Sequence, residues 1–549
     1  MKRIIAVYIL MLFCGTLFQV EANIGLENST NEKVVLVTDR SLYIAGEQIC
    51  FSAALISRAE KRSTVLYVEV LTIENSRVFS GKYDLVNNKA VGVIPTSHEL
   101  VSGWYIIKAY TKWMRNFGLE DFSISLVQVV NPKKGVKGES VVRANNNARV
   151  TLDSVFSHKG ISVIMEKKNY KPREKVQFSF NLSKSVTPIV VAAAVVPRQV
   201  GKGFHLKSNG NNENKTPEFI YPQEVNSLII CGKVTETMGK NAPYKRVNIT
   251  TLSPITDFIA GRTDSAGNFI IQLPKNKGRG ELFVGTEEVD GDEYRILIDS
   301  DYDTRPIALP HTPLSYSADL ALAMSQNYQI DSSYNYLQRL TLSDSITIGQ
   351  LPFYGKPEYS LFLDKYIQLP TIQEYFLELI HEVDIRSKNG RKYFKIQSNN
   401  SDMLTYDPLI LVDNIAIENH ERVLKIKANQ IEQIDLINNP YYKGEMTYGG
   451  IISFKSRKGD FAGIELSPSD IFVSYEMLAA SMCPELGVEE RSFFPDARNT
   501  LYWNPDIDPI TDSALHFYTP DLLGEYEIVI WVVDVDGNLI VNNEPFSVR

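Results

Sequence analysis

The chain has 549 residues, too many for one hydrophobic core, so we expect roughly three to five domains. Its composition, 44% hydrophobic and 22% charged, is typical of a globular protein and excludes a largely disordered chain. The formal net charge of −8 argues against nucleic acid as a partner. Tyr and Phe are abundant and Val and Ile recur in short runs, which predicts a mainly β fold.

The first residues have the pattern of a secretory signal peptide. Lys2 and Arg3 precede an apolar run, and Val20-Glu21-Ala22 fits the small residues of a cleavage site. We therefore expect residues 1–22 to be removed and the mature chain to cross the inner membrane. An N-terminal membrane anchor and lipidation at Cys14 remain as alternatives, although the apolar run is short for a span.

The mature chain offers little for covalent or membrane anchoring. No later stretch reaches the roughly 20 apolar residues of a transmembrane helix, so no membrane span is expected. Cys50, Cys231 and Cys483 remain, an odd number spaced far apart. One disulfide can form among them, but a disulfide framework is not expected.

Residues 23–132 predict a β-sandwich. In the run 48–56, Ile49, Phe51, Ala53 and Leu55 alternate with polar side chains, which indicates a half-buried strand. Turn residues separate the expected strands, which are Val34–Thr38, Gln48–Ile56, Val65–Ile73, Ala90–Pro95, Gly103–Lys112 and Ser123–Val130.

The same region carries a family resemblance. Val37-Thr-Asp-Arg-Ser-Leu-Tyr43, Gly46-Glu47-Gln-Ile49 and Ser102-Gly-Trp-Tyr105 resemble the second macroglobulin-type domain of the α2-macroglobulin family. The resemblance implies an immunoglobulin-like sandwich. It also suggests an internal thioester, but no Cys here has the Cys-Gly-Glu-Gln context that a thioester needs.

After a linker at 133–147, the opening pattern repeats. Tyr170, Glu174 and the apolar series Val176, Phe178, Phe180 and Leu182 align without a gap with Tyr43, Glu47 and Ile49 to Leu55. We therefore expect a second macroglobulin-like sandwich at 148–224, two unrelated amphipathic strands being the alternative. Because Arg173 replaces Gly46, the repeat is expected to share its inward face rather than the turn glycine.

Residues 227–300 predict a third, smaller sandwich. Thr263-Asp-Ser-Ala-Gly267-Asn is a tight hairpin turn by composition, and Phe269, Ile271 and Leu273 are expected to face inward. These residues resemble the carboxypeptidase regulatory-like domain, which implies a β-sandwich without peptidase chemistry. Residues 301–350 are expected to be a linker with short helices at Leu320–Met324 and Tyr334–Leu342.

Residues 351–465 have a mixed α/β pattern. Thr371 is the expected N-cap of a helix with Ile372, Tyr375, Phe376 and Leu379 on one face. Strands are expected at 407–413, 431–437 and 448–455, with helical residues at 419–428. This order resembles the plug domain of TonB-dependent outer-membrane receptors, with Asp413-Asn414 in place of the usual Asp-Gly. The receptor barrel needs on the order of 220 residues for its strands alone, so the plug-like unit is expected to lack one.

Residues 466–549 predict a last macroglobulin-like sandwich, since Leu523-Gly-Glu-Tyr526 is similar to Ser102-Gly-Trp-Tyr105. The combination of a macroglobulin-type, a regulatory-like and a plug-like unit resembles envelope proteins of Bacteroidetes. It implies a location in the periplasm or at the outer membrane.

No catalytic, cofactor or metal site is expected, and binding residues are not predicted. The sequence lacks Gly-x-Ser-x-Gly and a phosphate loop, and neither His98-Glu99 nor His420-Glu421 continues to a second histidine as zinc peptidases require. Two further sets of residues have competing interpretations. The acidic residues from Glu287 to Asp303 are either a cation site or solvated turns. The aromatic residues Trp104, Tyr105, Tyr110 and Trp113 are either core or a binding face.

The sequence therefore predicts a non-enzymatic, modular envelope protein that acts as a protein-interaction scaffold. Its expected partners are other envelope proteins, an outer-membrane β-barrel being one candidate. Two alternatives stay open: an accessory role in TonB-dependent nutrient uptake, and a macroglobulin-like protease inhibitor without a thioester. The ligand and the oligomeric state are not predicted.

Overall fold

A computed structural model describes residues 31–134, 150–153, 160–201, 203–208, 219–253, 255–287, 293–308, 317–334, 351–388, 390–479, 483, 486–487, 494–512 and 514–549. The expected signal peptide and most of the first linker lie outside these residues. The described chain is mainly β, as predicted. It divides into two compact units: unit 1 is Met1–Asn226, Tyr302–Leu342 and Ser481–Arg549, and unit 2 is Ser227–Asp301 and Ser343–Ala480.

The first sandwich of unit 1 follows the sequence prediction closely. One antiparallel sheet has the order β1 (Lys33–Thr38), β3 (Gln48–Ile56) and β6 (Lys89–Pro95). The facing sheet runs β5 (Arg77–Asp84), β4 (Val65–Thr72), β7 (Gly103–Tyr110) and β8 (Ser123–Val130), and β2 (Leu42–Ile44) pairs in parallel with β8. The strands β2 and β5 were not predicted. The sheet continues from β8 to β14 (Phe204–Ser208) and β9 (Val150–Asp153), which the sequence assigned to the next domain.

The strand β3 is buried on both faces, so the expectation of a half-buried strand was wrong. Ile49, Phe51 and Leu55 are fully buried, but so are Cys50 and Ala54 on the other face. Cys50 belongs to an apolar cluster with Trp531, and Ala54 belongs to another with Val190 and Val533. The second sandwich thus covers the face that the alternation assigned to water.

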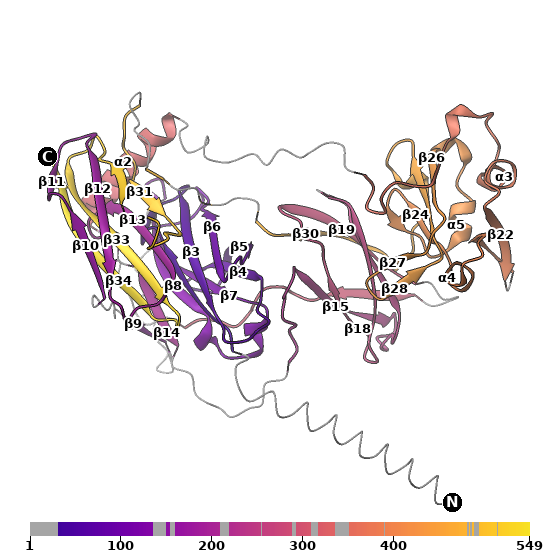
Figure 1. Ribbon diagram of the computed structural model, residues 1–549, viewed down its shortest axis with the longest axis horizontal. Helices are drawn as coiled ribbons and strands as arrows, with labels where there is room; N and C mark the ends of the chain where they lie inside the picture. The colour runs from indigo at the N-terminus through magenta and orange to yellow at the C-terminus, as the bar shows by residue number, and fades with distance from the viewer. Residues whose placement is uncertain are drawn as a thin grey trace, which may run out of the picture. The chain divides into compact units, whose positions relative to one another are not determined.

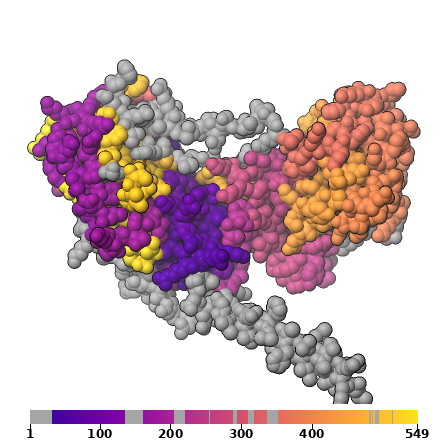
Figure 2. Space-filling model, in the orientation of Figure 1, coloured from indigo at the N-terminus to yellow at the C-terminus, as the bar shows by residue number. Residues whose placement is uncertain are grey.

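The second sandwich is built from two distant stretches of the chain. One sheet has the order β10 (Ile161–Met165), β12 (Lys175–Leu182) and β32 (Leu515–Tyr518). The other runs β31 (Tyr502–Asn504), β13 (Pro188–Pro197), β33 (Gly524–Asp534), β34 (Leu539–Val548) and β11 (Asn169–Tyr170). In Figures 1 and 2 the yellow C-terminal strands accordingly lie among the magenta ones of residues 160–200. The ranges 148–224 and 466–549, expected as two sandwiches, thus share one, because each leaves strand edges that only the other pairs.

The two sandwiches have the same topology, which supports the internal repeat. The order β5-β4-β7-β8, with β2 parallel to β8, corresponds to β31-β13-β33-β34, with β11 parallel to β34. The glycine is not shared, but the turn conformation is: Gly46 has φ +100° and Arg173, at the matching position, has φ +57°. Both residues adopt a left-handed backbone that glycine favours, and Arg173 is held there by ion pairing with Asp521.

Unit 2 contains a small sandwich and an α/β module. The sandwich has the sheets β18 (Asn268–Gln272)-β15 (Ile229–Glu236)-β20 (Tyr294–Ile298) and β17 (Asp257–Arg262)-β16 (Arg246–Thr251)-β19 (Arg279–Thr286)-β30 (Ile471–Glu476). Phe269, Ile271 and Leu273 face inward as predicted. The turn at 263–267 does not form a hairpin within one sheet, however, because β17 and β18 belong to different sheets. The strand β30, expected in the C-terminal sandwich, completes this one by pairing with β19.

The α/β module matches the predicted elements. Its sheet runs β21 (Tyr359–Phe362), β26 (Ile431–Ile437), β29 (Ile451–Ser456), β24 (Leu409–Val412) and β25 (Ile415–Ala416). Thr371 caps α3 (Ile372–Glu378) by accepting a hydrogen bond from the Glu374 N–H, and Ile372, Tyr375 and Phe376 are buried. A second helix, α5 (His420–Leu424), lies within the range predicted to be helical.

Two further features hold unit 1 together. Helix α2 (Ala318–Ser333) contains the expected segment Leu320–Met324 and packs through Ala321 and Met324, while most of Tyr334–Leu342 lies outside the described residues. Cys50 and Cys483 form a disulfide, which does not include Cys231. None of the helices in the described part of the chain has the length and apolar character that crossing a bilayer requires.

Candidate functional site

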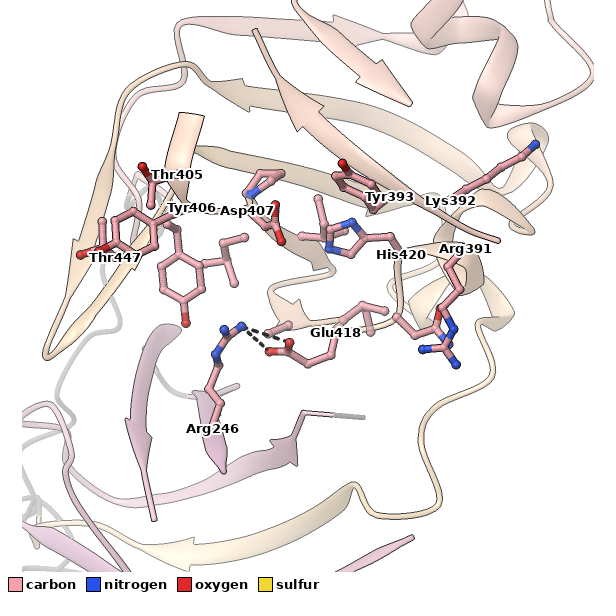
Figure 3. Close-up of a pocket in the computed structure, with 17 residues that line it drawn as sticks. Arg246, Arg391, Lys392, Tyr393, Thr405, Tyr406, Asp407, Glu418, His420 and Thr447 are labelled. Carbon is pink, nitrogen blue, oxygen red and sulfur yellow. Dashed lines mark hydrogen bonds and ion pairs between the residues drawn. The ribbon is translucent and has the colours of Figure 1, made fainter. Parts of the chain in front are cut away.

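A polar pocket of about 360 Å³ lies in unit 2, where the small sandwich meets the α/β module (Figure 3). Its walls come from segments far apart in the sequence. Arg246 begins β16 of the sandwich, and Tyr448 ends β28 (Met446–Tyr448). The remaining lining residues are Thr447 of β28 and residues in β23 (Arg391–Ile396), at 405–410 from the end of α4 (Ser401–Thr405), and at 416–420.

An ion pair forms one wall. The Arg246 guanidinium donates to both Glu418 oxygens over 3.2 and 3.1 Å, and the Asn248 amide donates to the same carboxylate over 2.6 Å. Burial opposes charge on Arg246, but the attraction and hydrogen bond to Glu418, together with the attraction of neighbouring groups, outweigh it and raise the pKa of the guanidinium. The guanidinium therefore keeps its charge, and the contact with Glu418 fixes Arg246 beside the pocket.

His420 forms a second wall as a neutral imidazole. Burial lowers the pKa of His420, and the Glu418 charge opposes that shift only in part. Its Nδ1 accepts a hydrogen bond from the Phe394 backbone N–H over 3.1 Å, which places the ring proton on Nε2. Phe394 also packs against the imidazole with ring centroids 5.8 Å apart, so the orientation of the ring is fixed.

Two buried polar atoms of the lining have no hydrogen-bond partner among the described residues. They are the Tyr448 hydroxyl and the Arg246 Nε. Tyr448 is 3% exposed, and burial raises the pKa of its phenol, which therefore keeps its proton. Buried polar groups in folded proteins nearly always have partners, so these two atoms mark where a ligand or water would bind.

The two acidic residues of the pocket lining already have partners. Asp407 pairs with Lys395 over 3.5 Å, and Glu418 is occupied by Arg246 and Asn248. The lining provides fixed hydrogen-bond donors and tyrosine rings, which orient a ligand. From the sequence, His420 is a candidate only for zinc binding and Arg246 is not a candidate, because the residues of this site meet only in the folded unit.

The residues that had two competing interpretations in the sequence do not line this pocket. Trp104, Tyr105 and Tyr110 are all buried in unit 1, so both faces of that strand belong to the core. Among the described residues no group of three or more metal-binding side chains comes together, and Glu288, Asp290 and Asp292 lie outside these residues.

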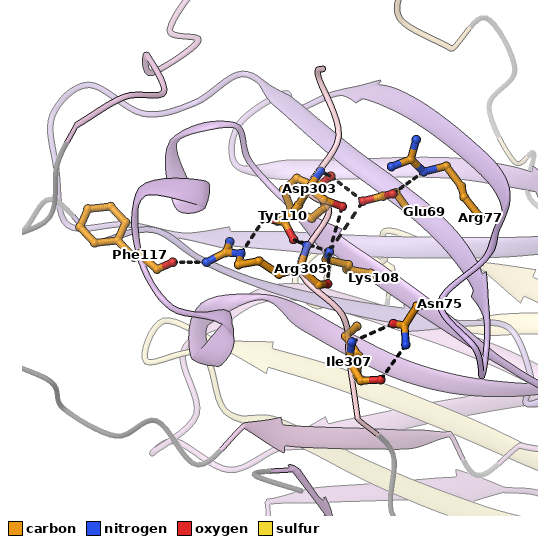
Figure 4. A network of polar contacts seen from close by, with 9 residues as sticks. All are labelled: Glu69, Asn75, Arg77, Lys108, Tyr110, Phe117, Asp303, Arg305 and Ile307. Atoms are coloured by element: carbon orange, nitrogen blue, oxygen red, sulfur yellow. Dashed lines mark hydrogen bonds and ion pairs between the residues drawn. The ribbon is translucent and has the colours of Figure 1, made fainter. Parts of the chain in front are cut away.

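Asp303, the last of the acidic residues, belongs to a buried network that fixes a connecting segment on the first sandwich (Figure 4). The Lys108 ammonium donates to the Asp303 carboxylate over 2.5 Å, and the Arg305 Nε donates to it over 2.7 Å. Tyr110 links this group to Glu69, accepting from the Asp303 N–H over 2.7 Å and donating to Glu69 over 2.6 Å. The network is structural, because its charges are paired with one another.

The sequence matches no protein-family model and no curated protein. The structure is similar to that of Salmonella α2-macroglobulin reacted with methylamine, at 9% identity and a TM-score of 0.22, covering 95% of this chain and 40% of that chain. It is also similar to Escherichia coli α2-macroglobulin activated by porcine elastase, at 10% identity and a TM-score of 0.21, covering 94% and 44%. The chain thus spans less than half the length of these proteins, and with such TM-scores the likeness supports no particular function.

Proposed function

We propose that the protein is a non-enzymatic binding scaffold of the bacterial envelope, in which unit 2 carries the binding site. The observation that carries this proposal is the polar pocket with its unpartnered Tyr448 hydroxyl and Arg246 Nε. Glu418 fixes Arg246 and the Phe394 backbone fixes His420, so the lining provides preorganised recognition.

Unit 1 supports the scaffold role. Its two sandwiches share apolar clusters, and the Cys50–Cys483 disulfide adds a covalent link within the unit, so unit 1 forms a stable frame. The secretory pattern of the first residues, which favours an envelope location, remains part of the proposal.

Site-specific photocrosslinking tests the proposal. Tyr406 lines the pocket and is 43% exposed, and Tyr244, also in unit 2, lies outside the lining and is 64% exposed. Each is replaced by p-benzoylphenylalanine, and the full chain is irradiated in intact envelopes. We expect an adduct from position 406 and none from position 244.

The identity of the adduct separates the alternatives. An outer-membrane receptor at position 406 would favour the accessory role in uptake, whereas a trapped protease would favour the inhibitor. Equal labelling from both positions, or robust hydrolysis of peptides or glycans by the purified mature chain, would contradict a binding scaffold.

A further inference from the structure

We propose that the pocket in unit 2 recognises a carboxylate on a small organic ligand, with the Tyr448 hydroxyl and the Arg246 guanidinium as the groups that bind it. This inference rests on the proposed function, since it names the ligand class of the same site. It depends on three properties of the pocket: unpartnered donors, charge and size.

The unpartnered groups of the pocket are hydrogen-bond donors. The Arg246 Nε can only donate a hydrogen bond, and the Tyr448 phenol keeps its proton and donates too. The His420 Nε2, which carries the ring proton, adds a third donor to the lining. A ligand that satisfies them must therefore supply acceptor oxygens, and a carboxylate offers two.

The charge of the lining selects an anion. Three cationic side chains, Arg246, Arg391 and Lys392, accompany two carboxylates, Asp407 and Glu418. Both carboxylates already have cationic partners, Lys395 and Arg246. With His420 neutral, the lining carries three positive and two negative formal charges, and this balance of +1 favours a negatively charged ligand even though the Lys392 ammonium donates to Gln373 outside the lining.

The size of the cavity limits the ligand. About 360 Å³ is near the lower end of ligand pockets, which suits a molecule the size of a dipeptide or a monosaccharide. Tyrosine rings at positions 393, 406 and 448 suit either molecule, so the carboxylate could come from a peptide C-terminus or from an acidic sugar.

Calorimetric titration of the full mature chain with four probes tests the inference. The probes are N-acetyl-alanyl-alanine, its C-terminal amide, glucuronate and glucose. We expect at least one acid to bind and its neutral counterpart to bind at least about tenfold more weakly. The reason is that one hydrogen bond to a charged group contributes about a factor of ten in affinity. The acid that binds identifies the source of the carboxylate.

The variant Tyr448→Phe removes only the unpartnered hydroxyl. We expect it to weaken binding of the acid about tenfold and to leave that of the neutral counterpart unchanged. Its thermal midpoint should not fall, because the hydroxyl has no partner in the free protein. The matched control is Tyr442→Phe, whose exposed hydroxyl donates to Asp402 outside the pocket lining, and it should bind the acid like the parent.

Three results would overturn the inference. An acid that binds no better than its neutral counterpart would show that the carboxylate is not recognised, and binding of none of the probes would indicate that water satisfies the two donors. Full affinity in the stably folded Tyr448→Phe variant would remove the hydroxyl from recognition. The scaffold function would survive each of them if position 406 still forms its specific adduct.

Discussion

Glu47 and Glu174, 127 residues apart, make the same local contacts in the two sandwiches of unit 1. The Glu47 carboxylate accepts a hydrogen bond from the Ile44 N–H over 2.6 Å, and the Glu174 carboxylate accepts one from the Lys171 N–H over 2.8 Å. Each also pairs with a cation seven residues earlier, Arg40 or Lys167. The surroundings differ, since the Glu47 side chain is 7% exposed and that of Glu174 is 30% exposed.

This difference predicts unequal effects of the same substitution. Glu47→Gln should lower the free energy of unfolding by about 3–5 kcal/mol, because it leaves the buried Arg40 without its partner. Glu174→Gln should cost at most about 1 kcal/mol, since solvent screens that pair. Urea titration followed by tryptophan fluorescence measures both, as all four tryptophans belong to unit 1. Equal losses would show that burial does not distinguish the two copies.

The disulfide is expected to stabilise unit 1. Cys483→Ser should lower its free energy of unfolding by about 2–5 kcal/mol, since Cys50 and Cys483 close a very long loop. Cys231→Ser is the control, because Cys231 lies in unit 2 and forms no disulfide. Thiol titration of the denatured mature chain should find one free thiol before reduction and three afterwards. Three thiols before reduction would contradict the disulfide.

The ion pair at Asp303 predicts a pH dependence. Burial alone would raise the pKa of the Asp303 carboxyl, but Lys108 and Arg305 outweigh it and lower the pKa below the ordinary value of 3.8. Burial lowers the pKa of the Lys108 ammonium, and the attraction to Asp303 opposes that shift only in part. Of the two pKa shifts, the one that stabilises the fold is therefore that of Asp303. Since its folded pKa is the lower one, the stabilisation is present above the unfolded pKa and is lost as pH falls through the folded value.

The variant Asp303→Asn measures this contribution. At pH 6 it should be less stable than the parent by about 3–5 kcal/mol, because Lys108 loses its buried partner. The difference should shrink as the pH falls below 3.8 and should disappear only below the lower folded pKa, where the folded parent loses the same charge. Urea titrations from pH 3 to pH 6 provide the measurement, and a constant difference would contradict the pair.

The shared second sandwich predicts how fragments behave. A fragment of residues 148–224 should show no cooperative unfolding, since β12 and β13 lose β31, β32 and β33 as partners and β11 loses β34. A chain that joins residues 160–208 to 494–549 through a Gly/Ser linker should recover β-structure, because it restores both sheets. Circular dichroism compares the two, and a cooperative transition in the first fragment would disprove the shared sandwich.

Much of the secondary structure could be predicted from local patterns. The errors arose where a pattern was too short or carried no information about contacts between distant strands. Alternation at a period of two identified β3, but it gave no information that the second sandwich covers the face assigned to water. The short strand β2 has too few residues to show a period. The turn at 263–267 was identified by its residues, but whether a turn closes a hairpin depends on which sheet each strand joins.

The candidate site could not be predicted from such local patterns. Arg246, His420 and Tyr448 are unremarkable in their own segments, and nothing in the spacing brings them together. They meet because β16 of the sandwich packs beside the α/β module, where burial makes His420 neutral and leaves the Tyr448 hydroxyl unpartnered.

The sequence by itself determined the mainly β class, most strands, the cap of α3 and the repeated motif at Tyr43 and Tyr170, because these depend on side-chain type at short spacing. The tertiary structure alone decided that residues 160–200 and 500–549 close one sandwich, that Cys50 bonds to Cys483, and that Glu47 is buried while Glu174 is not. Strand pairing and burial are set by contacts between residues hundreds of positions apart, and a local pattern carries no information about them.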